Sequence, residues 1–503
     1  MLQFHWRVEN GGAVLIGCDD PAGHVAVPEE AMGLPVIAVG DRAFLGADRM
    51  TGIDLPPTLT RIGQNAFLGC AALQSVTLPD GVTALGTGAF EGCASLQGAL
   101  LSPALTEIPP RAFYLCRSLQ AIRVPDHVAA IGQSAFSGCA ALTGVSLPEG
   151  LHTIGPEAFA GCAALRGVRI PRSVTRIDAT SLPAQLHTRG GLFLSGSGLL
   201  IRATASLRWA APEGTRILAD GALAGNHDLT EVALPDTVTA IGDRSFADCR
   251  CLHHIGLPEG LERLGREAFR DCRRLTGVVL PRRLNVLSDG LFEGSGLMSA
   301  VLPEGVARLG DRAFAGCADL RQVTLNPGLE RIGASAFARC TSLKAIALQQ
   351  GLLSIGPHAF LDCRALETVT LPAEALPEGL ADALTDLRRV RIVAPALPPE
   401  AFPPLWRKRV CLGFAHAAQA GVPYRPEVRE ACLSWLAAHA AALTGEAAND
   451  PALLRLLLDH RLLSPADARR LVDRFSRQDD TETVLELLHY AREAQEDEGD
   501  ALW

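Results

Sequence analysis

The chain has 503 residues, 48% of them hydrophobic and only 5% aromatic, and its formal net charge is −9. The negative charge and the absence of a basic run argue against a nucleic-acid partner, because phosphate binding depends on clustered Lys and Arg. No run of 18 apolar residues occurs, so the sequence predicts no membrane-spanning helix and no membrane partner.

Residues 1–41 are expected to form an N-terminal β cap. Four short apolar segments alternate with turn residues, as strands do; they are 4–8, 14–16, 25–27 and 36–39. A solenoid needs the open edge of its first coil covered, and these strands are suited to that position. The segment also lacks the basic and apolar parts of a secretory signal, so we expect a cytoplasmic protein.

From residue 42 onward one short unit repeats many times, for example LQSVTLPDGVTALGTGAFEGCAS from Leu73 to Ser95. In this copy the spacing of Leu73, Val76 and Leu78 predicts a short strand with one apolar face, which Pro79 ends. The apolar residues that follow are three and four positions apart. That spacing favours a helical turn or a 3₁₀ segment rather than a second long strand.

A phenylalanine, or a leucine in its place, marks each copy of the unit. The fourteen positions are Phe44, Phe67, Phe90, Phe113, Phe136, Phe159, Leu182, Leu223, Phe246, Phe269, Phe292, Phe314, Phe337 and Phe360. They are equally spaced except at 292–314, where the step is shorter by one position, and at 182–223, where extra residues interrupt the series. Such regularity predicts a solenoid in which each Phe lies on the Phe of the next coil, since one unit alone has no core.

The units IGQNAFLGCAALQSVTLP (62–79), IGQSAFSGCAALTGVSLP and IGPEAFAGCAALRGVRIP resemble the BspA-like class of bacterial leucine-rich repeats. The resemblance covers about three quarters of the chain. It implies an α/β repeat fold, namely a right-handed solenoid with its sheet on the concave side. It also implies a role in binding or adhesion, with no catalytic residues.

Ten of the fourteen cysteines stand three residues after the repeat Phe: Cys70, Cys93, Cys116, Cys139, Cys162, Cys249, Cys272, Cys317, Cys340 and Cys363. Stacked coils place these thiols ~4.8 Å apart, which holds their Cβ atoms farther apart than the ~3.8 Å that a disulfide prefers. We therefore expect a ladder of buried, reduced thiols and a reducing compartment. No CxxC pair or His pair with ligand spacing indicates a metal site.

Residues from about 183 to 210 interrupt the repeat. The segment GGLFLSGSGLLIRAT (190–204) has two apolar runs around a turn that contains Ser195, which predicts a hairpin projecting from the solenoid. The turn lacks both the GxSxG elbow of a nucleophile and the Lys of a phosphate-binding loop. The repeat then continues, so that the whole solenoid domain spans residues 42–397.

Residues 398–503 follow a proline-rich join and are expected to form a small all-α domain of four or five helices. Three helix N-caps are predicted, at Asn449 or Asp450, Ser464 and Asp480. A further helix is expected to bury one stripe, made of Ala431, Trp435, Ala438 and Ala442.

The outward strand positions of the repeats, two in each unit, are mostly small and contain no Tyr or Trp. They form either a solvated sheet face or a broad, weak groove for a protein. The candidate protein-binding residues on this concave face are Arg123, Arg169, Glu231, His254 and Gln322. Arg123 and Arg169 lie two coils apart and suit an acidic segment. No catalytic, metal-binding or cofactor-binding residue is assigned.

These observations predict a non-enzymatic protein-interaction scaffold without a cofactor, whose protein partner and oligomeric state the sequence does not identify. One alternative is a cell-surface adhesin exported by an unconventional route. The other is an enzyme or regulatory activity in the helical domain.

Overall fold

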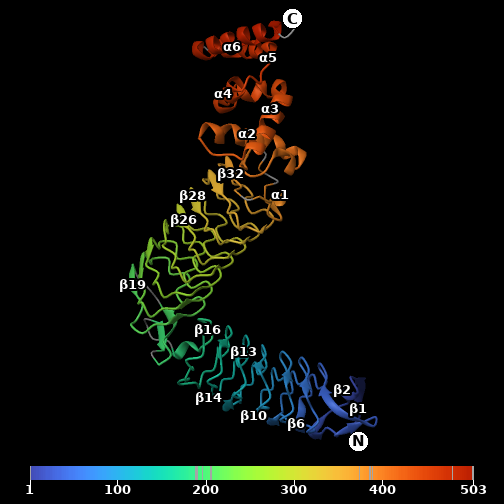
Figure 1. Ribbon diagram of the computed structural model, residues 1–503. Coiled ribbons are helices and arrows are strands. Elements are labelled where there is room, and N and C mark those ends of the chain that lie inside the picture. Colours follow the sequence, from blue (N-terminus) through green and yellow to red (C-terminus); the bar gives the residue numbers. More distant parts are fainter. Residues whose placement is uncertain are drawn as a thin grey trace. The chain divides into compact units, whose positions relative to one another are not determined.

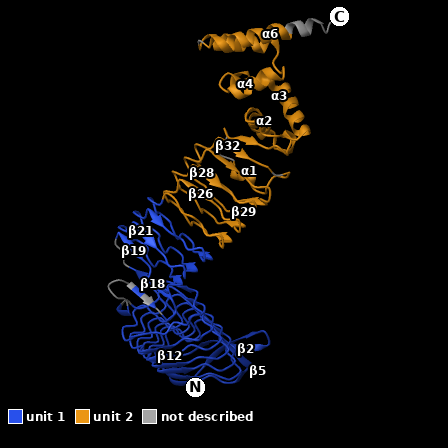
Figure 2. Cartoon of the chain, turned by 60° about the vertical axis from the view of Figure 1, so that its left-hand side comes forward, with its two compact units in different colours: residues 1–275 blue, residues 276–503 orange. Residues whose placement is uncertain are grey.

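The computed structural model in Figure 1 describes residues 2–186, 191–194, 196–203, 207–372, 374–384, 387, 389–478 and 480–500. The chain forms two compact units, residues 1–275 and 276–503, which Figure 2 shows in different colours. About 16 solenoid coils lie between residues 13 and 393, and a region of five helices follows them. The predicted fold class is confirmed, whereas the predicted domain boundaries stay predictions.

The N-terminal strands occur where the sequence predicts them; they are β1 (Phe4–Glu9), β2 (Gly12–Cys18), β3 (Ala22–Ala26), β4 (Glu30–Ala31), β5 (Leu34–Val39) and β6 (Arg49–Asp54). β1 and β2 form an antiparallel hairpin, and β4 pairs antiparallel with β5. β2 pairs in parallel with β5, and β3 with β6, so both strand ladders of the solenoid begin before residue 42. The pairing register shifts between His5 and Trp6 in β1 and between Gly23 and His24 in β3. Both are edge strands, and such irregular edges hinder pairing with another chain.

Most coils contribute a strand to a long-strand ladder, as expected from the LxxVxL spacing. In unit 1 its strands after β6 are β8 (Ser75–Thr77), β10 (Gly98–Leu100), β12 (Ala121–Arg123), β14 (Gly144–Ser146), β19 (Arg208–Ala210), β21 (Glu231–Ala233) and β23 (His254–Ile255). In unit 2 they are β26 (Ser299–Val301), β28 (Gln322–Thr324), β30 (Ala345–Ala347), β32 (Thr368–Thr370) and β33 (Arg391–Val393). The paired strands are parallel and in register.

The second apolar set of most coils begins with a two-residue strand, which the sequence does not predict, and these strands form a short-strand ladder. In unit 1 its strands are β7 (Arg61–Ile62), β9 (Ala84–Leu85), β11 (Glu107–Ile108), β13 (Ala130–Ile131), β15 (Thr153–Ile154), β16 (Arg176–Ile177), β20 (Ile217–Leu218), β22 (Ala240–Ile241) and β24 (Arg263–Leu264). In unit 2 they are β25 (Val286–Leu287), β27 (Arg308–Leu309), β29 (Arg331–Ile332) and β31 (Ser354–Ile355). Stacking aligns the same two strand residues of successive coils, so the backbone groups of these residues bond between coils. The predicted tight turns occur in the rest of the set, where for example the Glu91 N–H donates to the Gly88 carbonyl oxygen at 3.0 Å and the Cys93 N–H to the Phe90 carbonyl oxygen at 3.3 Å.

The repeat phenylalanines form the stacked core that the sequence predicts. In unit 1 the rings from Phe44 to Phe159 lie parallel, with centroids of neighbouring rings 5.0 to 5.5 Å apart. In unit 2 the rings from Phe292 to Phe360 stack at 5.5 to 5.6 Å. Leu182, in the same register, is also buried. The apolar core is therefore continuous along the coils of each unit.

The ladder cysteines are buried and free, and each thiol bonds to the coil before it. For example, the Cys93 Sγ donates to the Phe67 carbonyl oxygen at 3.2 Å, and the Cys139 Sγ donates to the Phe113 carbonyl oxygen at the same distance. The acceptor lies 26 residues back, which is one repeat plus the interval between Phe and Cys. The thiol ladder thus contributes hydrogen bonds as well as apolar volume.

Two residues in most coils have positive φ, which makes the chain turn sharply around the Phe. One stands two residues before the Phe, as at Arg111 with φ 59°, and the other two residues after it, as at Gly92 with φ 72°. Gly86 has a different role, since a Cβ there would lie 2.4 Å from the backbone of the preceding coil. Gly86 therefore permits a close contact between coils, whereas the sequence predicts a sharp bend there.

The interruption contains the predicted hairpin, formed by β17 (Gly191–Leu194) and β18 (Leu199–Ala203) after a 3₁₀ turn at Ala184–Leu186. Contrary to prediction, the hairpin does not simply project. β18 pairs in parallel with β20, because its apolar residues Leu199 and Leu200 are buried in the ladder. Ser195, which the sequence predicts to lie in a turn, is outside the described residues.

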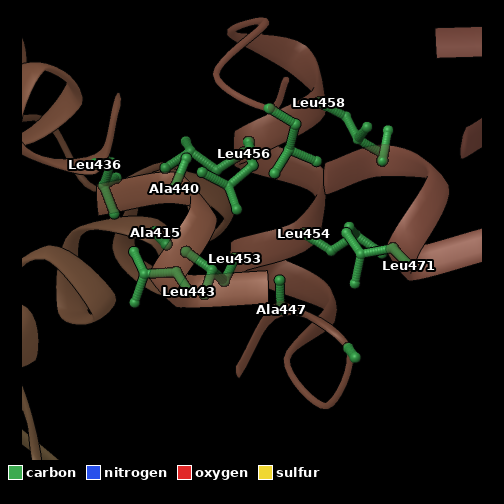
Figure 3. Packing of buried hydrophobic residues seen from close by; sticks show 14 of the residues in the cluster. Ala415, Leu436, Ala440, Leu443, Ala447, Leu453, Leu454, Leu456, Leu458 and Leu471 are labelled. Carbon is green, nitrogen blue, oxygen red and sulfur yellow. The ribbon is translucent and has the colours of Figure 1, made fainter. Parts of the chain in front are cut away.

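The C-terminal part of unit 2 is helical, as predicted; after α1 (Leu380–Ala383) and a 3₁₀ turn at Pro399–Ala401, its helices are α2 (Pro404–Gln419), α3 (Pro426–Ala447), α4 (Pro451–Asp459), α5 (Pro465–Ser476) and α6 (Thr481–Asp500). The predicted caps are confirmed, since Asp450, Ser464 and Asp480 accept backbone N–H bonds in the first turns of α4, α5 and α6. Figure 3 shows the leucine-rich core of these helices.

The predicted buried stripe of α3 is wrong by about one position. The residues that this helix buries are Val428, Cys432, Leu436, Ala440, Leu443 and Ala447. Ala438 and Ala442, which the sequence reading placed in the core, are exposed. Alanines occur on several sides of α3, and the side with the larger Leu and Val side chains faces the core because it buries more apolar area.

Helix α2 packs directly against the last solenoid strand, β33. A Cβ at Gly413 would lie 2.2 Å from the carbonyl oxygen of Ile392, so glycine is what permits this approach. Arg409 Nε also donates to the Val390 carbonyl oxygen at 2.8 Å. Helix α2 therefore covers the end of the long-strand ladder in unit 2.

Candidate binding face

The strand face of unit 1 is defined here by the outward side chains of its long strands from β6 to β14 and of the segment 167–169 that follows. Register places equivalent residues of successive coils side by side, as Gly98 with Ser75 and Leu100 with Thr77. A first row consists of Gly52, Ser75, Gly98, Ala121, Gly144 and Gly167. A second row consists of Asp54, Thr77, Leu100, Arg123, Ser146 and Arg169.

The first row forms an open floor. A Cβ at Gly98, Gly144 or Gly167 would meet no atom within 4 Å, and none of these glycines has positive φ. Neither backbone conformation nor crowding requires glycine there. Since glycine inside a strand costs roughly 0.5–1 kcal/mol relative to alanine, these residues lower stability while keeping the floor clear.

A third row borders the floor on its other side and was missed in the sequence reading. It consists of Gln74, Gln97 and Gln120, one residue before β8, β10 and β12, and all three residues are exposed. Their backbones join the coils, since Gln97 N–H donates to the Gln74 carbonyl oxygen at 2.8 Å and Gln120 N–H to that of Gln97 at 3.1 Å. In the sequence, the recurrence of these three glutamines at the repeat interval is the signal that identifies the row. Together the three rows form a largely polar face across the strands, called the groove below because a hollow lies near each end of it.

The structure places Arg123 and Arg169 in the second row of this face, two coils apart. Arg123 lies in β12 and its guanidinium is 3.8 Å from Asp126, whereas Arg169 lies beyond β14 and is 3.6 Å from Glu149. Their side chains are 78% and 91% exposed, so these pairs are worth only ~0–1 kcal/mol each. Both guanidinium groups therefore remain available to a ligand carboxylate.

Arg169 also borders a hollow between its coil and the hairpin. The hollow has a volume of about 640 Å³, and Glu149, Arg172, Leu194 and Gly196 line it as well. Arg172 Nε donates to the Gly196 carbonyl oxygen at 3.1 Å, which ties the hairpin to the solenoid. The hairpin thus bounds the groove beyond β14.

The other predicted site residues lie outside this groove. Glu231 is in β21 and pairs with Arg208 of β19 at 3.0 Å, and His254 is exposed in β23. Gln322 is exposed in β28 of unit 2. Of the five candidates, only Arg123 and Arg169 therefore share the groove.

The opposite end of the groove holds a histidine–aspartate pair. His24 Nε2 and Asp54 Oδ2 are 2.8 Å apart. The imidazole lies over Gly52, where a Cβ would be 2.5 Å from His24 Nδ1. A hollow of about 580 Å³ opens here, with Gln74, Ser75 and Thr77 among its lining residues. Sequence reading missed this pair because the separation of its members along the chain is not a repeat interval.

The buried thiols of the core are not activated as nucleophiles. Burial raises the pKa of Cys162 to about 12 and also raises that of Cys139, so both thiols stay protonated near neutral pH. Within the part of the chain that the structure describes, no three His, Cys, Asp or Glu side chains converge to hold a metal ion. The same described residues contain no helix long and apolar enough to cross a membrane.

Several solved structures are similar to this chain, all with TM-scores below 0.5. Similar solved structures include a leucine-rich repeat protein from Bacteroides ovatus (25% identity over 78% of this chain and 98% of that one, TM-score 0.38). A leucine rich cell surface protein from Faecalibacterium prausnitzii matches at 21% identity over 78% and 93%, TM-score 0.26. The pneumococcal vaccine antigen PcpA matches at 18% identity over 78% and 96%, TM-score 0.31.

A search of curated proteins gave no match. The family model described as BspA type Leucine rich repeat region (6 copies) matches residues 37–166, 106–184, 209–321 and 286–377. These matches cover more than half of the chain, and they include the stacked phenylalanines and all ten ladder cysteines. The chain belongs to the BspA-type leucine-rich repeat family.

Proposed function

We propose that the chain is a non-catalytic protein-binding scaffold, and that the strand face of unit 1 holds an extended segment of a partner protein. The observation that carries the proposal is the groove with an open glycine floor. Glutamines from three consecutive coils, Gln74, Gln97 and Gln120, border the floor on one side, and the second row borders it on the other. Glycine with no structural requirement is expected where another backbone comes close.

The partner segment should present acidic side chains to Arg123 and Arg169. Guanidinium groups form paired hydrogen bonds with carboxylates, and both groups are exposed on the same face. The small Gly144 and Ser146 between them allow the segment to approach the sheet. Amide groups of Gln74, Gln97 and Gln120 supply donors and acceptors for its backbone.

The proposal is tested by capturing a partner with the full chain and titrating it against variants. Replacing both Arg123 and Arg169 with Ala should weaken the complex by at least ~2 kcal/mol, about 30-fold in Kd, without changing the melting temperature. The matched control replaces Arg117 and Arg274, two exposed arginines outside the groove, with Ala. If the groove variant keeps full affinity, partner binding lies elsewhere on the chain.

We further propose that the protein works in a reducing compartment, the cytoplasm. All fourteen cysteines are free, and the ladder thiols donate hydrogen bonds that a disulfide would abolish. Fractionation with protease added to intact cells tests this location. Digestion of the protein outside intact cells would favour the surface adhesin instead.

A further inference from the structure

We propose that unit 2 contains a small-molecule site between its helices α2, α3 and α4, and that this site takes the phosphate monoester of a short polyol. The hollow between the three helices has a volume of about 430 Å³, and small-molecule pockets span roughly 300–1,000 Å³. Its lining residues belong to unit 2, so the proposal goes beyond protein binding at the strand face of unit 1 and stands independently of it.

The floor of the hollow is apolar and already formed. Ala415 and Ala418 of α2 and Ala452 and Leu456 of α4 line it, and all four residues are buried or partly buried. Ala415 and Leu456 also belong to the leucine-rich core that holds the helices together (Figure 3). A ligand therefore meets small side chains that the fold keeps in place, and its binding needs no rearrangement of the helices.

Two arginines at the hollow have no partner in the chain. Arg429 of α3 and Arg455 of α4 both line it and are exposed. Within the residues that the structure describes, neither guanidinium group forms a hydrogen bond or an ion pair with the protein. By contrast, Lys408 of α2 pairs with a glutamate of α3, and Arg470 of α5 pairs with an aspartate of its own helix. The two unpaired guanidinium groups are therefore available together to one anionic ligand.

The charge around the hollow is mainly positive. Asp459 also lines it and lies one turn after Arg455 on α4, but among the described residues these two form no ion pair. Glu427 and Glu430, the acids nearest to Arg429 along α3, do not line the hollow. Two guanidinium groups thus face one carboxylate, and a cleft with an excess of one sign of charge concentrates ligands of the opposite sign.

A phosphate monoester suits this arrangement better than a carboxylate does. Its phosphate carries a charge of about −1.5 to −2 at pH 7 and has three acceptor oxygens, so it can bond to both guanidinium groups at once. A single carboxylate has one charge and two oxygens, which one guanidinium group satisfies. His460, at the end of α4, lines the same hollow and adds a ring N–H donor for the phosphate.

The organic part of the ester is expected to carry hydroxyl groups. The Asp459 carboxylate accepts hydrogen bonds, and the amide of Gln419 on α2 both donates and accepts them; both residues are exposed and line the hollow. Among the described residues, no Phe, Tyr or Trp lines the hollow, so no large ring is placed to stack on a nucleotide base. A short polyol phosphate, for which glycerol 3-phosphate is a suitable probe, therefore matches the lining.

Calorimetric titration of the full chain tests the proposal with three probes: glycerol 3-phosphate, inorganic phosphate and glycerol. Glycerol 3-phosphate should bind at one saturable site with a Kd below about 1 mM. Inorganic phosphate should bind at least about 3-fold more weakly, because it lacks the hydroxyl groups that contact Asp459 and Gln419. Glycerol alone should give no saturable signal, since it lacks the charged group.

Variants connect the binding to the hollow. Arg429→Gln with Arg455→Gln should weaken glycerol 3-phosphate binding at least about 10-fold and leave the melting temperature unchanged, because both side chains are exposed and unpaired. The matched control, Arg117→Gln with Arg477→Gln, removes the same charge from exposed arginines outside the hollow and should keep the parental affinity. Asp459→Asn should retain phosphate binding but reduce the preference for the ester.

Several results would overturn the proposal. They are no saturable binding of glycerol 3-phosphate to the parent, parental affinity in the Arg429 and Arg455 double variant, and an equal loss of affinity in the control variant. Equal binding of inorganic phosphate and glycerol 3-phosphate, or an Asp459→Asn variant with the parental preference, would overturn the assignment of the ligand as a polyol ester.

Discussion

Truncating one ring of the phenylalanine stack should destabilise unit 1 by more than an ordinary cavity does. Phe136 is fully buried between Phe113 and Phe159, with ring centroids 5.5 and 5.4 Å away. Phe→Ala in a core typically costs about 3–5 kcal/mol. Each lost ring contact contributes a further ~0.5–1.5 kcal/mol, and Phe136 makes two of them. Phe136→Ala should therefore lower the free energy of unfolding by about 4–8 kcal/mol.

Phe136→Leu separates volume from ring stacking, because leucine occupies the same register at Leu182 and Leu223 and is buried there. It should cost only about 1–3 kcal/mol, mainly the two ring contacts. Chemical denaturation of each full-length variant, with hydrogen exchange as the readout, measures the loss of stability coil by coil. This readout is needed because repeat arrays can unfold locally around the damaged coil. If Phe136→Ala unfolds at the same denaturant concentration as the parent, the stacked-core reasoning is wrong.

Four further predictions concern the thiols, the groove floor and the end of the solenoid. Native protein should react with a thiol reagent mainly at the partly exposed Cys18 and Cys251, and at nearly all cysteines after unfolding; fast native labelling of Cys139 would contradict this. Burial raises the thiol pKa in the folded state, so the thiols should not change the free energy of unfolding below their ordinary pKa of about 8.5. Above that pH the free energy of unfolding should fall as the pH rises toward 12. A flat profile over that range would show ionisable, accessible thiols. Gly144→Thr should leave thermal stability equal or raised by up to ~1 kcal/mol, since its side chain meets open space, but should weaken partner binding; unchanged binding in a titration would remove the floor from the site. A chain ending at residue 395 should stay folded but have a less stable unit 2, because α2 no longer covers β33; hydrogen exchange in β33 equal to that of the full chain would show that the helices are dispensable.

The repeat, its core and its strands were predictable because each depends on apolar residues at fixed intervals. Phe136 and its equivalents recur at the constant interval of the repeat, and Val76 and Leu78 have strand spacing, so local chemistry and period indicate the same coil. The caps at Asp450 and Ser464 were predictable for a similar reason, since capping depends on a side chain within the same turn.

Other features depend on contacts between coils and leave weaker local signals. Arg111 has positive φ although arginine does not favour that conformation, and its N–H donates to the Gln133 carbonyl oxygen of the next coil at 2.9 Å. That bond exists only when coils are stacked, and it offsets the cost of ~1–2 kcal/mol that positive φ carries for a residue other than glycine. The short-strand ladder and the thiol–carbonyl bonds were missed for the same reason.

The candidate site was predicted only in part. The strand spacing located Arg123 and Arg169 on one face, because outward positions follow from the two-residue period. The pairing of His24 with Asp54 joins the N-terminal segment to the first coil, where no repeat interval relates the two residues. Strand spacing does not identify the third row, because Gln74, Gln97 and Gln120 precede the two outward positions of each unit.

The thiol–carbonyl bond between successive coils bears on how such an array changes length during evolution. Each bond links a cysteine to a phenylalanine one coil earlier, so every junction between two ordinary coils is chemically alike. Duplication or deletion of one whole repeat in the gene restores identical junctions on both sides and exposes no new core. The length of the strand face can therefore vary among descendants without a redesign of the interior.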